Sequence, residues 1–195
     1  MRRAPPVPTS KKASGHFSTS ARRVLANPER KSAAAPAIRA ASDADFPGIW
    51  AIFQQVIAAG DTYAYVADTT RREARRLWTE APAEAFVADD GGHILGTYTL
   101  KPAQPVLGNH IANCGYMTHP DARGRGIGDA LCAHSLTTAR ERGYTAMQFN
   151  YVVASNETAI RLWQKHGFDI LGRVPAAFRH RELGLTDVLI MHRTL

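Results

Sequence analysis

The chain has few cysteines and no long hydrophobic run. Of its 195 residues only Cys114 and Cys132 are cysteines, and they form neither a disulfide framework nor a CxxC metal-binding spacing. Two isolated cysteines are typical of a reducing compartment. No segment approaches the roughly 18 consecutive apolar residues that a membrane-spanning helix needs, so we expect no membrane partner. The eight histidines contain no HxH or HxxxH pair, so we also expect no metal ion.

Most of the chain lacks an excess of positive or negative charge. The net charge is +7, but eight of the 24 Lys and Arg residues and only one of the 17 Asp and Glu residues lie within residues 1–36. The rest of the chain is electrically balanced, which argues against a nucleic-acid-binding module. Residues 1–36 also hold five of the 11 prolines and few large apolar side chains, so we expect a disordered basic tail.

The composition of residues 1–36 is compatible with two cellular locations. The segment is rich in Arg and Ser and nearly free of acidic residues, which also suits an organellar transit peptide. We therefore expect a cytoplasmic protein, with a mitochondrial one as the alternative if the tail is a transit peptide.

Residues 37–195 show the periodic patterns of one folded domain. Strands are predicted at residues 37–40, 85–88, 94–100, 111–118, 146–153, 168–174 and 187–192. Helices are predicted after a Ser42 capping box up to Gly60, over residues 71–79, from Ile127 to Gly143, and from Asn156 to Gly167. Residues 89–92 predict a hairpin turn, and a charge-rich loop is expected between the last two strands. This order of elements predicts an α+β, or mixed α/β, fold.

A turn rich in arginine and glycine follows the strand at residues 111–118. Three glycines, Gly124, Gly126 and Gly128, precede or open the helix that starts near Ile127. Bare N–H groups at a helix N-terminus bind anions, and glycine lets a diphosphate approach the backbone. An ordinary strand-to-helix connection is the alternative. The dinucleotide pattern GxGxxG is absent because residue 129 is Asp, and no GxxxxGK occurs.

Two motifs carry a resemblance to a known family. Arg123-x-x-Gly126-x-Gly128 resembles the acyl-CoA-binding motif of the GNAT superfamily of N-acetyltransferases, and residues 156–168 resemble that family's Asn-x-x-Ala-x-x-Leu-Tyr-x-x-x-Gly-Phe segment. The resemblance covers roughly residues 37–195. It implies a central, largely antiparallel sheet with a V-shaped split between two strands, flanked by helices. It also implies direct transfer of an acetyl group from acetyl-CoA to an amine, with no protein nucleophile.

The resemblance implies roles for particular residues. It assigns acetyl-CoA contacts to Tyr116, Met117, Thr118, Arg123, Gly124, Arg125, Gly126, Ile127, Gly128, Asp129 and Asn156. The N–H groups of residues 125–129 would hold the pyrophosphate. The strand end at residues 116–118 would diverge from its neighbour at a bulge, and the N–H of Met117 would stabilise the oxyanion of acyl transfer.

One position departs from the family pattern. Many superfamily members carry a tyrosine that protonates the leaving thiolate where this chain has Trp163, and an indole N–H is no practical acid. Tyr116, Tyr151 and Cys114 are unranked alternatives, as is water.

A narrower resemblance is to the fungal L-azetidine-2-carboxylate acetyltransferases, which also carry Trp at this position. It rests on residues 100–105, 110–115, 149–156, 162–168 and 170–174. It implies that Asn113 contacts the substrate carboxylate, and that Asn150 and Asn156 orient the substrate and stabilise the reacting centre. An amide both donates and accepts without adding net charge. For Asn156 a helix N-cap is a compatible structural role, and for Asn150 the alternative is plain strand packing.

The expected function is acetylation of a small amine, such as an amino acid or a proline analogue. Acetylation of a protein or peptide is one alternative, and a non-catalytic acyl-CoA-binding module is the other. The oligomeric state stays open, with a homodimer as one alternative.

Overall fold

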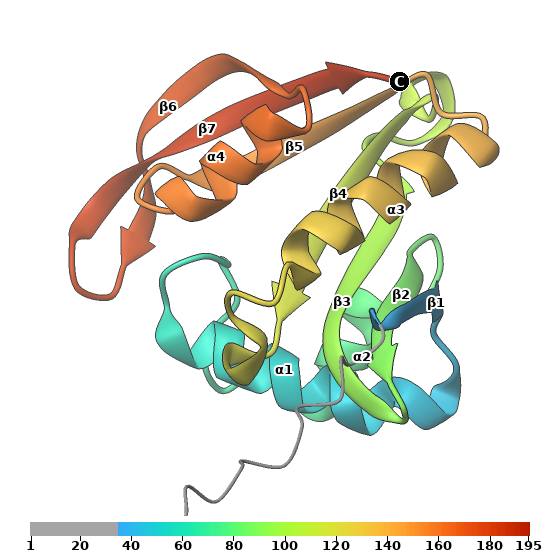
Figure 1. Cartoon of the computed structure of the whole chain (residues 1–195). Helices are drawn as coiled ribbons and strands as arrows, with labels where there is room; N and C mark the ends of the chain where they lie inside the picture. Colours follow the sequence, from blue (N-terminus) through green and yellow to red (C-terminus); the bar gives the residue numbers. More distant parts are fainter. Residues whose placement is uncertain (1–34) are drawn as a thin grey trace, which may run out of the picture. The chain divides into compact units, whose positions relative to one another are not determined.

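The structure, a computed structural model, describes residues 35–195 (Figure 1). The prediction of a disordered tail or transit peptide at residues 1–36 therefore falls almost wholly outside the described residues. Within residues 35–195 no helix is both long enough and apolar enough to cross a membrane.

Within residues 35–195, seven strands form one sheet in the order β1-β2-β3-β4-β5-β7-β6. The strands are β1 (Ala37–Ala40), β2 (Glu84–Asp90), β3 (His93–Pro102), β4 (Ile111–Thr118), β5 (Ala146–Val153), β6 (Asp169–His180) and β7 (Gly184–Thr194). Neighbouring strands are antiparallel except for β4 and β5, which are parallel. The predicted mixed fold with a largely antiparallel sheet is confirmed.

In the described part of the chain, four α-helices cover the two faces of the sheet. They are α1 (Phe46–Ala59), α2 (Arg71–Trp78), α3 (Ile127–Glu141) and α4 (Glu157–Lys165). On β3, Thr97 accepts a hydrogen bond from Trp78 of α2 (3.0 Å), whereas the next residue, Tyr98, reaches His134 of α3 (2.7 Å). Successive strand side chains point to opposite faces, so α2 and α3 lie on opposite sides of the sheet. The predicted Ser42 capping box is present, but it opens a single 3-10 turn (Asp43–Asp45) directly before α1.

The pairing of β4 with β5 stops after two residues. Ile111 pairs with Ala146 and Ala112 with Met147, and beyond this point the two strands diverge, as Figure 1 shows. The predicted V-shaped split is confirmed. We call the side of β4 that faces β5 beyond Ala112 the open edge.

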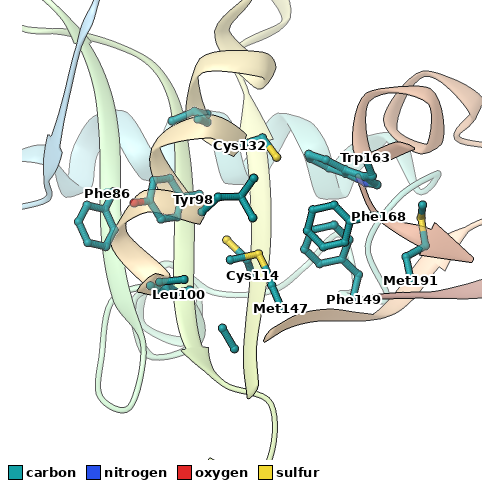
Figure 2. Packing of buried hydrophobic residues seen from close by; sticks show 14 of the residues in the cluster. Phe86, Tyr98, Leu100, Cys114, Cys132, Met147, Phe149, Trp163, Phe168 and Met191 are labelled. Atoms are coloured by element: carbon teal, nitrogen blue, oxygen red, sulfur yellow. The ribbon is translucent and has the colours of Figure 1, made fainter. Parts of the chain in front are cut away.

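The predicted cause of the split is wrong. The β3–β4 ladder runs from Gly96 to Pro102 without a register shift, so β4 carries no bulge there. Large aromatic side chains pack against one another on the face of the split that α3 and α4 cover. The ring of Tyr116 lies 5.9 Å from that of Phe149 and 4.6 Å from that of Trp163, and Figure 2 shows Phe149, Trp163 and Phe168 gathered on the side of β5 and α4.

The last two strands are longer than predicted. The segment expected as a charge-rich loop belongs to β6 and β7, which form one hairpin with a short turn at residues 181–183. A bulge interrupts β6 between Val174 and Phe178, and Asp187 of β7 accepts the N–H of Ala176 (2.9 Å). Much of this hairpin is exposed, so it lacks the alternation of apolar residues that identifies a half-buried strand.

Candidate active site

The glycine turn leaves its backbone open to solvent. Gly124 and Gly126 have φ angles of 75° and 74°, a region that glycine adopts without steric cost. Within the described residues, and apart from its neighbours in the chain, a Cβ atom added at either glycine would meet no atom within 4 Å. The space in front of this backbone is therefore free for a ligand.

Four consecutive N–H groups at the start of α3 have no acceptor within the described residues 35–195. The first helical hydrogen bond runs from Ala130 to the carbonyl of Gly126 (3.0 Å), and nothing in that part of the chain accepts from residues 126–129. The N–H of Arg125, which was also expected to hold the pyrophosphate, instead donates to the carbonyl of Ala122 (3.2 Å). These groups carry the positive end of the helix dipole. The arrangement fits the diphosphate of a nucleotide cofactor such as CoA.

The acidic residue in this helix turn is neutralised by the end of α4. Oδ1 of Asp129 accepts hydrogen bonds from Lys165 Nζ (2.7 Å) and His166 Nε2 (2.9 Å). The hydrogen bond from Lys165, and to a lesser degree the one from His166, holds the pKa of Asp129 below its usual range. A bound anion therefore meets a paired carboxylate at this position.

The open edge presents the N–H groups of Tyr116 and Thr118. His119 donates to the carbonyl of Leu95, and Ile111 accepts from Ala103, both at 2.8 Å. Because backbone polar groups alternate in direction along a strand, the odd-numbered residues of β4 face β3. Met117 pairs with Thr97 in that ladder, so its N–H is not free, and the choice of Met117 as the oxyanion donor does not fit the structure. The N–H of the preceding residue, Tyr116, faces the open edge.

Two of the three predicted asparagines lie near the fork of the split. Asn113 is half-buried, and its Nδ2 donates to the carbonyl of Gln148 on β5 (2.9 Å). Asn150 is exposed where the β5–β7 register shifts, and its Oδ1 accepts from Gln148 Nε2 (2.7 Å). Gln148 therefore contacts both asparagines. The structure supplies a strand-bridging role for Asn113, and its substrate contact stays a prediction.

Asn156 is the N-cap of α4. Its Oδ1 accepts the N–H of Ala159 at 3.2 Å, so the structural role foreseen for it is confirmed. Within the described chain it shares no hydrogen bond with Asn113 or Asn150. Its roles in catalysis and in cofactor binding stay predictions.

The three candidate acids differ in burial. The hydroxyl of Tyr116 lies 2.7 Å from Ser135 Oγ beneath α3, and desolvation raises its pKa well above the usual value. Desolvation also raises the pKa of the buried Cys114 thiol. A group that holds its proton so tightly is a poor acid. Tyr151 is 44% exposed, and its hydroxyl donates to the carbonyl of Ala177. It is the candidate that reaches solvent.

Tyr63 is a site residue that the sequence did not reveal. It lies in the connection between α1 and α2, and its hydroxyl donates to the carbonyl of Tyr116 at 2.8 Å. No motif marks the position. The available signal was the pair Tyr63 and Tyr65 in an otherwise small and polar connection.

The fold and the site define a class of protein. The model of the acetyltransferase (GNAT) family matches residues 50–168. The chain therefore belongs to this family, and the predicted class of acyltransferase is confirmed. A GCN5-related N-acetyltransferase from Kribbella flavida has a similar structure, with a TM-score of 0.79 and 41% identity over 83% of this chain and 98% of that one.

One of the relatives with a similar sequence is named for a small-molecule substrate. An L-methionine sulfoximine/L-methionine sulfone acetyltransferase from Pseudomonas paraeruginosa is 31% identical over 71% of this chain and 83% of its own length. The N-acetyltransferase aca1 from Schizosaccharomyces pombe is 36% identical over 44% of this chain, and the match spans only 41% of aca1. A phosphinothricin acetyltransferase from Sinorhizobium meliloti in complex with AcCoA shares the fold, with a TM-score of 0.74 at 23% identity over 83% of this chain and 89% of that one.

Proposed function

We propose that the protein transfers the acetyl group of acetyl-CoA to the amine of a small molecule, such as an amino acid or an amino-acid analogue. The observation that carries the proposal is the row of free N–H groups at residues 126–129 beside the open edge of β4. Family membership and the acetyltransferase with bound AcCoA support acetyl-CoA as the cosubstrate.

Acetyl-CoA supplies an activated acetyl thioester. Residues 126–129 bind its diphosphate through their N–H groups, and the N–H groups of Tyr116 and Thr118 are the donors that the open edge offers to the acyl end. In the transfer a C–N bond forms as the C–S bond breaks. The proton that the amine loses is balanced by the proton that the thiol gains. Tyr151 is our candidate for moving that proton, directly or through water.

A small polar acceptor suits the fork of the split. Asn113, Gln148 and Asn150 place neutral amides there, and amides can pair with both a carboxylate and an amine. The relative that acts on L-methionine sulfone, an amino-acid analogue, supports the same substrate class. We extend this proposal to proline analogues on the narrower resemblance above.

The test is an assay of thiol release from acetyl-CoA with a panel of amines. The panel holds amino acids, azetidine-2-carboxylate, L-methionine sulfone, polyamines, aminoglycosides and peptides. We expect turnover with an amino acid or analogue. A highest rate with peptides would favour protein acetylation instead, and no turnover together with no binding of acetyl-CoA in calorimetry would refute the proposal.

Substitutions at two asparagines test the roles assigned to them. Asn150→Ala removes the amide, and we expect kcat/KM for the best amine to fall about tenfold, the loss of one good hydrogen bond. Asn156→Asp keeps the cap oxygen of α4, so a loss of activity there reports on the amide and not on helix stability. Unchanged turnover in both variants would contradict the roles.

The alternative is a non-catalytic acyl-CoA-binding module. It is favoured by Trp163, which stands where many relatives have an acid, and by the raised pKa values of the half-buried Tyr116 and the buried Cys114, both caused by desolvation. Binding of acetyl-CoA without turnover on any amine of the panel would support this alternative.

A further inference from the structure

Tyr63 holds the backbone of the open edge from outside the sheet. Its ring stacks on Tyr65, with centroids 5.6 Å apart, and meets Trp78 edge-on at 5.8 Å. Desolvation raises the pKa of Tyr63 well above its usual value, so the phenol stays protonated. Its O–H donates a hydrogen bond to the carbonyl of Tyr116 (2.8 Å). Aromatic packing therefore presents a fixed donor to one peptide group of β4.

This hydrogen bond changes what the open edge offers at Tyr116. The N–H and C=O of one residue project side by side from the edge of a strand. An uncapped carbonyl would present its negative end beside any oxygen bound at the N–H. Because Tyr63 occupies one lone pair of the carbonyl and offsets its negative end, the edge at this residue favours a group that accepts from the N–H.

We propose that Tyr63 is a positioning residue that makes the open edge at Tyr116 selective for an oxygen that gains negative charge during acyl transfer. The inference rests on the proposed function. Preorganised donors act most strongly on the transition state, where the charge develops. Loss of the hydroxyl should therefore lower kcat more than it weakens the binding of the cosubstrate.

Gly115 is coupled to this contact. A Cβ atom at residue 115 would lie 3.2 Å from the hydroxyl oxygen of Tyr63 and 3.4 Å from Trp78. The first distance is tight for a side chain contact, so Gly115→Ala should push the hydroxyl away from the carbonyl of Tyr116. If the phenol oxygen is absent, the added methyl group has room.

The experiment compares Tyr63→Phe with Tyr65→Phe, which removes a hydroxyl from the neighbouring ring of the same stack. Thiol release is measured with the panel amine that gives the highest rate, and calorimetry measures the Kd and stoichiometry of acetyl-CoA and of free CoA. We expect Tyr63→Phe to lower kcat at least tenfold. Its Kd for CoA should stay within twofold of wild type and its stoichiometry at one, while Tyr65→Phe stays within twofold in every measure.

A double-mutant cycle separates positioning from simple packing. Gly115→Ala alone should lower kcat severalfold, whereas Tyr63→Phe/Gly115→Ala should resemble Tyr63→Phe alone, because both changes remove the same hydrogen bond. Additive losses would overturn the coupling and with it the positioning role.

A spectroscopic readout needs no amine. The carbonyl 13C resonance of [1-13C]acetyl-CoA moves downfield when the oxygen accepts a hydrogen bond. We expect this shift in the wild-type complex and in Tyr65→Phe, and a smaller shift in Tyr63→Phe. Equal shifts in all three proteins would overturn the inference while the proposed function stands. A wild-type protein that does not bind acetyl-CoA would instead remove the proposed function itself.

Discussion

The two arms of the split sheet are built differently. In the arm of β1 to β4, β3 is buried from Ile94 to Leu100, and one register shift interrupts the ladders. In the arm of β5 to β7 there are three shifts, and β6 exposes large apolar side chains such as Leu171 (64% exposed). A buried, regular ladder resists deformation, whereas bulged and exposed strands have fewer contacts to lose when they move.

This difference assigns the arms separate tasks. The regular arm carries the open edge, whose donors need a fixed position, and its face is braced by α1, α2 and the loop that bears Tyr63. The bulged arm contacts the end of α1 through Arg181 at the hairpin turn, whose backbone N–H donates to the carbonyl of Gly60 (3.0 Å) and whose guanidinium donates to the carbonyl of Ala58. We expect the regular arm to set the geometry of the chemistry and the bulged arm to adapt to the acceptor.

The largest effect is expected in the core of the regular arm. Phe53 of α1 is fully buried and packs on Tyr65 and Trp78, with centroids 5.4 Å and 6.0 Å apart. Phe53→Ala removes the ring and leaves a cavity, so the free energy of unfolding should fall by about 3–5 kcal/mol. Urea denaturation measures it. A loss below about 1 kcal/mol would show that this arm relaxes as readily as the other.

An ion pair in each arm gives the next contrast. Arg39 binds both oxygens of the buried Asp45 (2.8 and 2.7 Å), whereas the pair of Arg173 with Asp187 is largely exposed. Asp45→Asn should cost about 2 kcal/mol at neutral pH, since hydrogen bonds to a charged group are lost. Asp187→Asn should cost less because solvent screens the pair. Equal losses would contradict the contrast.

The Asp45 effect should depend on pH. The hydrogen bonds from Arg39 lower the pKa of Asp45 far below its usual value. A depressed pKa in the folded state stabilises the protein above the unfolded value of about 3.9 and loses this effect as pH falls toward the folded pKa. The difference between wild type and Asp45→Asn should therefore be full at pH 6 and shrink below pH 4, as followed by urea denaturation. If the stability difference between wild type and Asp45→Asn grew as the pH fell, the pKa of Asp45 would be raised by folding and the prediction would be wrong.

The anion-binding turn has a matched control in the hairpin of the bulged arm. Gly126 and Gly184 have nearly equal φ angles, 74° and 73°, and open space around an added Cβ. Alanine strains both positions alike. Only Gly126→Ala should weaken acetyl-CoA binding, about tenfold or 1.4 kcal/mol, because only that methyl group stands before the free N–H groups. Calorimetry measures the Kd of acetyl-CoA for the two variants. Equal Kd values in Gly126→Ala and Gly184→Ala would show that the diphosphate binds elsewhere.

The smallest effect is expected at the exposed edge of the sheet. Leu171→Ala on β6 removes a side chain that is mostly in water already. The free energy of unfolding should change by less than about 0.5 kcal/mol. A loss above about 1.5 kcal/mol at micromolar protein, absent at high dilution, would show that Leu171 is buried by a second molecule.

Local patterns in the sequence predicted most helices, strands and turns well. They did not predict which residues of distant elements contact one another. The helix bounds followed from apolar spacing and from caps such as Asn156, which act within one turn. The hairpin at Gly91 and Gly92 followed from turn chemistry. The length of the β6–β7 hairpin was missed because exposed, bulged strands carry no period-2 signal.

The glycine turn and the family motifs were readable in the sequence alone, because the need for free N–H groups before a helix acts over only a few residues. Which N–H of β4 faces the open edge was decided by register with β3, a long-range pairing that places Tyr116 there instead of Met117. The contact of Tyr63 with Tyr116 joins residues 53 positions apart. Only the packing of α1, α2 and the sheet brings these two together, because no local pattern records a neighbour supplied by another part of the fold.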